Sequence, residues 1–154
     1  MTQQEAHRRL RRIIDEMLAA RFALGRAEAK WDTEMGTPAA DFRGRVTLDE
    51  IRRAADNLGR TFLLRLFAEF EGILLSYWQD GLGRVSEPKV SVLISRIAEL
   101  CPRPVSDTHR NGVHHVRDYR NMLVHPHARQ VDSLAVDQCL SRLGKYLAYF
   151  PQKW

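Results

Sequence analysis

Hydrophobic residues recur at helical spacing near the start of the chain, from about Gln3 to Trp31, where most residues are strong helix formers. The recurring apolar residues are Leu10, Ile13, Ile14, Met17, Leu18, Phe22 and Leu24. The opposite side carries four arginines, namely Arg8, Arg9, Arg11 and Arg12. The pattern predicts a long first helix, whose basic side is either a solvated face or a surface that contacts nucleic acid.

A second apolar segment begins at a helix-capping signal. Glycine and proline residues between positions 32 and 45 indicate a loop, and Thr47 followed three residues later by Glu50 matches a capping box. The predicted second helix runs to about Gln79, shortly before Gly81, and is apolar over most of its circumference. Its apolar residues include Phe62, Leu63, Phe67, Phe70, Leu74, Leu75, Tyr77 and Trp78.

Three shorter helices are predicted in the rest of the chain, over residues 86–100, 107–125 and 133–149. Their expected caps are Ser86, Ser106 or Asp107, and Asp132 or Ser133. The middle one should end at His125, because Pro126 disfavours helical geometry in the residue before it. No stretch alternates with a period of two residues. We therefore expect an all-α fold, a single-domain up-and-down bundle of about five helices.

Composition supports one folded domain. The 154 residues are 44% hydrophobic and 28% charged, which suits a compact core rather than a disordered chain. Charges interrupt the apolar runs before the roughly 20 residues that a membrane span needs, and we find no secretory signal, so a cytoplasmic location without membrane association is expected. Cys101 and Cys139 lie far apart without CxxC spacing, which predicts reduced core thiols. A net charge of +5 favours an anionic partner, or reflects a merely basic surface.

The predicted fourth helix has two distinct sides on a helical wheel. Its apolar arc, which we expect to face the core, contains Val113, Val116, Tyr119, Leu123 and Val124. A separate polar stripe contains His114, Arg117, Asn121 and His125 at spacings of three and four residues. Arg120 lies between Val116 and Val124 at the margin of the apolar arc, so its guanidinium needs a partner.

The second helix offers that partner in Glu71, which lies in the middle of its apolar arc. Arg65 and Glu69 lie instead on the opposite, polar side. An isolated buried carboxylate is costly, so Glu71 should be either paired or neutral. We predict an ion pair between Glu71 and Arg120 that fixes the orientation of the guanidinium.

The segment Arg120-Asn121-Met122-Leu123-Val124-His125 closes the predicted fourth helix and is followed by Pro126. These residues, on an all-helical domain of this size with an apolar second helix, resemble the RNxxxH motif of the HEPN family. The resemblance covers residues 47–150 as a HEPN-like core, preceded by an N-terminal helix and loop over residues 1–46.

This resemblance implies a metal-independent endoribonuclease that acts as a homodimer and needs no cofactor. Arg120, Asn121 and His125 would be catalytic: the histidine transfers protons to and from the reacting oxygens, and the arginine stabilises charge on the phosphate. The ribose 2′-OH would attack, which leaves a 2′,3′-cyclic phosphate and a 5′-hydroxyl and spares DNA. His114, Arg117 and His127 are expected to contact RNA, with Glu71 in support.

The expected dimer also answers a geometric difficulty, because Arg120 and His125 point about 140° apart on an ideal helix. Two copies related by a twofold axis can combine their side chains at one phosphate, and unwinding of the last helical turn is an alternative. Some HEPN toxins are controlled by a partner nucleotidyltransferase that modifies a tyrosine two residues after the motif histidine. Here that position is His127, so this route of control is not expected.

The sequence also allows other interpretations of these residues. Arg120 could be a structural ion-pair residue, and His125 a simple helix cap. His114, His115, His125 and His127 could ligate zinc, but the sequence contains no accompanying HExxH motif. The leading hypothesis is a toxin or phage-defence ribonuclease with a possible antitoxin or regulatory protein. Alternatives are a non-catalytic HEPN-like module that binds RNA, a nucleotide or a partner protein, and a helical dimerisation domain.

Overall fold

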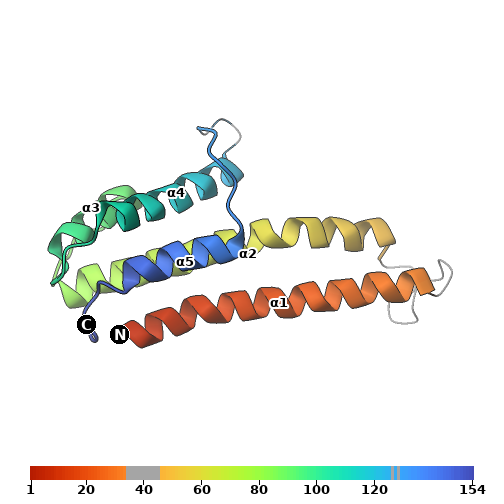
Figure 1. Cartoon of the computed structure of the whole chain (residues 1–154), viewed down its shortest axis with the longest axis horizontal. Coiled ribbons are helices and arrows are strands. Elements are labelled where there is room, and N and C mark those ends of the chain that lie inside the picture. The colour runs from red at the N-terminus through yellow and green to blue at the C-terminus, as the bar shows by residue number, and fades with distance from the viewer. Residues whose placement is uncertain (34–45, 126, 128) are drawn as a thin grey trace.

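The computed structural model describes residues 1–33, 46–125, 127 and 129–154, and these residues form an all-α bundle, as predicted (Figure 1). Their helices are α1 (Gln3–Thr33), α2 (Leu48–Ser76), the π-helical turn η2 (Tyr77–Gly81), α3 (Val90–Leu100), α4 (Asp107–Val124) and α5 (Val136–Leu147). Of the predicted loop over residues 32–45, residues 32 and 33 belong to α1, and residues 34–45 lie outside the described residues. None of the described helices combines the length and apolar content that a membrane span requires.

The helices lie in three layers. Figure 1 shows α1 and α2 as an antiparallel pair. The end of the pair that contains the last turns of α1 and the first turns of α2 extends beyond the other helices. The second half of α2 and α5 form the middle layer, with α1 on one side and with α3 and α4 on the other. Because α4 contacts α2, α3 and α5, the helix that carries the motif is held from three directions.

Local signals set two helix starts as predicted. The Thr47 hydroxyl accepts a hydrogen bond from the Glu50 N–H (3.2 Å), and the Glu50 carboxylate accepts one from the Thr47 N–H (2.6 Å). These bonds confirm the capping box. The Thr47 N–H and hydroxyl both donate to the Glu50 carboxylate and lower its pKa, because they favour its charged form. The Ser106 hydroxyl caps α4 by accepting from the His109 N–H. Both caps satisfy N–H groups that a helix start leaves without partners.

The predicted starts of the other two helices were wrong. α3 begins at Val90 rather than at Ser86, whose carbonyl accepts a hydrogen bond from Trp78 Nε1 (2.9 Å) instead of opening a helix. α5 begins at Val136 with Ala135 as its cap, rather than with Asp132 or Ser133. The predicted caps precede the helix in a segment without regular secondary structure, in which Leu134 is buried in the core. In both places tertiary contacts outweigh a local capping signal.

The core runs through the middle layer and explains how α1 is divided. Leu10, Ile13, Ile14 and Met17 of α1 are buried as predicted. Leu18 and Phe22 were expected to join them but are 51% and 68% exposed, because only α2 accompanies this part of α1. Cys101 and Cys139 are buried and unpaired, and burial raises the pKa of each thiol to about 11.

Candidate functional site

The two predicted sides of α4 are present in the structure. Val113 and Val116 are fully buried, whereas His114, Arg117 and Asn121 are half-buried and His125 is exposed. The residues of the apolar arc are less buried toward the end of the helix, where Tyr119 and Leu123 are half-buried and Val124 is 39% exposed. The polar stripe therefore becomes more accessible as α4 approaches the motif.

The motif side chains gather at the C-terminal end of α4. Arg120 Nη1 donates a hydrogen bond to Asn121 Oδ1 at 3.1 Å. The His125 N–H donates to the Asn121 carbonyl at 2.8 Å, while its own backbone, with φ −118° and ψ 109°, has left helical geometry. Among the described residues, the His125 side chain has no hydrogen bond. The end of α4 thus presents two features: the exposed imidazole of His125, and an arginine that is hydrogen-bonded to an amide.

The predicted ion pair between Glu71 and Arg120 is not formed. Within the described part of the chain, neither residue has an ion-pair partner. The register of the antiparallel helices α2 and α4 explains the difference, because Arg60 of α2 donates to the Leu123 carbonyl. Glu71 lies about 16 Å beyond Arg60 along α2, but Arg120 lies only about 5 Å before Leu123 along α4. Glu71 is therefore too far along its helix.

The polar residues of α2 also have unexpected partners. Glu69 pairs with Arg9 of α1, and Arg65 pairs with Glu16 of α1. The side of α2 that was expected to be solvated therefore borders α1. Both pairs are partly exposed, so each contributes little to stability.

Two residues that were expected to contact RNA, His114 and Arg117, belong to a network inside the chain. Arg117 Nη1 donates to His114 Nδ1 (3.1 Å), and His114 Nε2 donates to the Ser95 hydroxyl of α3 (3.3 Å). Arg117 also makes two hydrogen bonds to Asp118. Burial, and then the charge of Arg117, lowers the pKa of His114 and favours its neutral form. His127, by contrast, is exposed beyond the end of α4.

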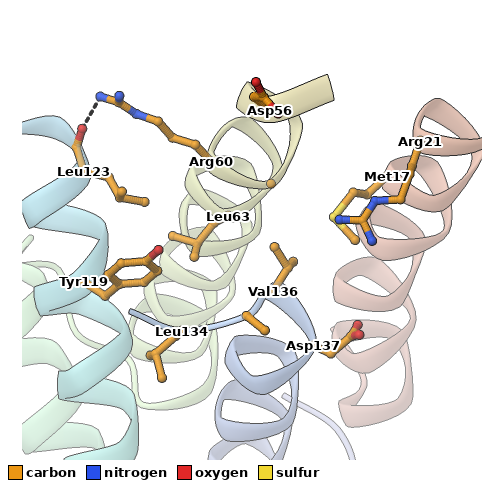
Figure 2. A pocket seen from close by; sticks show the side chains of 12 residues that line it. Met17, Arg21, Asp56, Arg60, Leu63, Tyr119, Leu123, Leu134, Val136 and Asp137 are labelled. Atoms are coloured by element: carbon orange, nitrogen blue, oxygen red, sulfur yellow. Dashed lines mark hydrogen bonds between the residues drawn. The ribbon is translucent and has the colours of Figure 1, made fainter. Parts of the chain in front are cut away.

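Arg60 is a residue near the motif that the sequence did not single out. Its guanidinium donates to the Leu123 carbonyl, one of the last carbonyls of α4 that lack an acceptor role within the helix. Arg60 is one of the residues that line a cavity of about 340 Å³ between α1, α2, α4 and the start of α5. Figure 2 shows the side chains around this cavity. Tyr119 and Leu123 line this cavity, but Arg120, Asn121 and His125 do not. In the sequence, the end of α4 lacks a glycine that could cap it, so its last carbonyls need other donors. This was the only sequence signal for a residue such as Arg60.

No group of three or more histidine, cysteine, aspartate or glutamate side chains among the described residues could hold a metal ion. Comparisons of the chain with profiles of known protein families, with curated proteins and with solved structures gave no significant match. The resemblance to HEPN domains therefore rests on the motif and on its position at the end of a helix.

Proposed function

We propose that the protein is a metal-independent endoribonuclease of the toxin or phage-defence type that cleaves RNA as a homodimer. The observation that supports this function is the exposed His125 at the end of α4, in the same helix end where Arg120 donates a hydrogen bond to Asn121. Arg120 has no carboxylate partner in the described residues, so its charge is available to a phosphate. An arginine without a carboxylate partner among the described residues and an accessible imidazole, both at one end of α4, suit catalysis of phosphate transfer.

The reaction needs two proton transfers. One base removes the proton of the ribose 2′-OH as its oxygen bonds to phosphorus, and one acid protonates the 5′-oxygen as its bond to phosphorus breaks. His125 serves in one of these roles, and Arg120 stabilises the charge on the non-bridging oxygens. The products are a 2′,3′-cyclic phosphate and a 5′-hydroxyl, and DNA is not cleaved because it lacks the nucleophile.

A second copy of the chain would supply the other histidine. A twofold axis near the end of α4 would place the motifs of two subunits around one cleft. Val124, which is 39% exposed beside His125, gives this end of the helix an apolar contact for the partner copy. The dimer also accounts for the divergent directions of Arg120 and His125 on a single helix.

The enzymatic proposal is tested with purified protein, single-stranded RNA and a chelator. Wild type should release fragments with cyclic-phosphate ends, and His125→Ala and Arg120→Ala should each lower the rate by roughly 10²–10⁴-fold. Arg84→Ala, which removes an exposed arginine outside the site, is the matched control and should cleave at the wild-type rate. Absence of cleavage at every salt concentration, or cleavage that both motif variants retain, would contradict the proposal.

Two further outcomes separate the alternatives. A DNA strand of the same sequence should remain intact, and the protein should sediment as a dimer at micromolar concentration. RNA binding that depends on Arg120 without any cleavage would favour a non-catalytic binding module instead. The hydrogen bond from Arg120 to Asn121 is the feature that would fit such a module, because it engages the guanidinium within the chain.

A further inference from the structure

A second polar site lies between the first half of α4 and α5, away from the motif. It is a pocket of about 400 Å³, here called the α4–α5 pocket, lined by Thr108, His109, Asn111, Gly112, His115, Arg142 and Lys145. This lining contains the cations of Arg142 and Lys145, two histidines and no carboxylate. Such a set of donors favours an anion over a cation or an apolar ligand.

Hydrogen bonds show how Arg142 is held in this pocket. Its Nη1 donates to His115 Nδ1 at 2.7 Å, and His115 Nε2 bonds to the Asp132 carbonyl at 3.2 Å. Because a guanidinium only donates and a carbonyl only accepts, His115 carries its proton on Nε2 and is neutral. Arg142 is thus positioned by a neutral partner and keeps further N–H donors.

Arg142 and Lys145 are cations without an ion-pair partner in the part of the chain that the structure describes. In the described residues, no carboxylate lies within 4.0 Å of either cationic group, whereas Arg9, Arg65 and Arg117 each have such a partner. Arg142 is half-buried, so the missing counter-ion is more costly there than on an open surface. A bound anion would supply the missing charge.

The pocket connects to the face of α4 that carries the motif. A neighbouring groove of about 400 Å³ shares Asn111 and His115 with it and is also lined by His114, Asp118, Arg129 and Gln130, among others. Asp118 precedes Asn121 by less than one helical turn on the same side of α4. His115 and His125 are roughly 15 Å apart along the helix axis, which an extended nucleic-acid strand of a few nucleotides can span.

We propose that the α4–α5 pocket binds a phosphate group of the RNA strand whose scissile phosphate lies at His125. Arg142 and Lys145 bind the phosphate oxygens, and Thr108 and Asn111 add polar contacts. The identity of the ligand as RNA rests on the ribonuclease function proposed above, whereas the anion site itself does not. Free inorganic phosphate carries the same anionic oxygens as an RNA phosphate. The experiment must therefore distinguish binding of RNA from binding of inorganic phosphate.

The test compares two double variants of the full chain in a His125→Ala background, which prevents cleavage. Arg142→Gln/Lys145→Gln removes the two pocket cations. Arg84→Gln/Lys89→Gln removes one exposed arginine and one exposed lysine outside the pocket. Fluorescence anisotropy with labelled single-stranded RNA measures the affinity at several salt concentrations.

The pocket variant should bind RNA at least about tenfold more weakly than the control, whose affinity should stay within about twofold of the parent. Its dependence of log K on log salt should flatten by about 0.7 for each phosphate that the variant no longer neutralises. Because Arg142→Gln also removes the bond to His115, Lys145→Gln alone serves as a second variant, and thermal unfolding verifies that each protein folds. Equal affinity of the pocket and control variants would overturn the proposal.

Amide NMR shifts of Gly112 and His115 separate the two sources of phosphate. Shifts upon addition of RNA at micromolar concentration support the proposal, whereas shifts with inorganic phosphate but none with RNA overturn the assignment to RNA. The cleavage assay distinguishes failure of the proposed ribonuclease function from failure of the proposed phosphate site in the α4–α5 pocket. If His125→Ala abolishes cleavage but the pocket variant binds RNA normally, only the pocket assignment fails. If wild type never cleaves but the pocket variant loses RNA binding, only the ribonuclease function fails.

Discussion

The two halves of α4 differ in how firmly the rest of the molecule holds them. In the first half, Ser106 caps the helix, Val113 and Val116 are fully buried, and His114 and His115 bond to neighbouring segments. After Val116 no residue of α4 is fully buried. The first half of α4 is therefore packed into the core, whereas the second half carries the exposed polar side chains of the motif. We expect the second half to be the less stable of the two.

The largest expected difference between the halves concerns apolar side chains. Val116→Ala should lower the free energy of unfolding by about 1–3 kcal/mol, because it removes two methyl groups from the core and leaves a cavity. Val124→Ala is the matched substitution in the second half and should cost less than about 0.5 kcal/mol. Urea unfolding followed by circular dichroism measures both. Equal losses would show that the end of α4 is packed as tightly as its start.

Arg60→Met tests what holds the second half. Loss of its hydrogen bond to the Leu123 carbonyl should change global stability by no more than about 1 kcal/mol, because the side chain is exposed. The local effect should be clearer, with faster hydrogen exchange of the Val124 and His125 amides at the last turn. Arg60→Lys keeps a cation and should lie between wild type and Arg60→Met. Unchanged exchange in Arg60→Met would mean that the last turn does not depend on this hydrogen bond.

The smallest expected effect is a pH dependence that originates in the first half. The folded protein lowers the pKa of His114 below its ordinary value of 6.5, through burial and Arg117, so protonation favours the unfolded chain. This contribution to stability is intact above pH 6.5 and is lost as the pH falls toward the lower folded pKa. His114→Gln should therefore flatten the fall in unfolding free energy between about pH 7 and pH 5.5.

The matched control is His127→Gln, because the His127 side chain is exposed beyond the end of α4. Its unfolding free energy should follow the wild-type pH curve. Parallel curves for wild type and His114→Gln would instead show that the network of His114, Ser95 and Arg117 does not persist in solution.

Sequence patterns predicted the helices best where a local signal and the core agree. Thr47 with Glu50 and Ser106 marked true helix starts because their bonds lie within one turn. Ser86, and Asp132 or Ser133, offered similar signals and failed. Trp78 donates to the Ser86 carbonyl, and Leu134, directly after the second pair, is buried in the core before the helix begins. Local capping energies of about 1 kcal/mol are easily outweighed by such tertiary contacts.

At the candidate site too, local features were predicted from the sequence, and contacts between helices were not. Periodicity determined that α4 has a buried side and a polar stripe, and the proline after His125 in the sequence determined that the motif ends the helix. Both signals are local to one helix. Only the tertiary structure decided that Arg60, not Glu71, reaches the end of α4, and that Arg142 of α5 meets His115. Periodicity specifies which side of a helix faces a neighbour, but the axial offset between two helices arises from packing of the whole core.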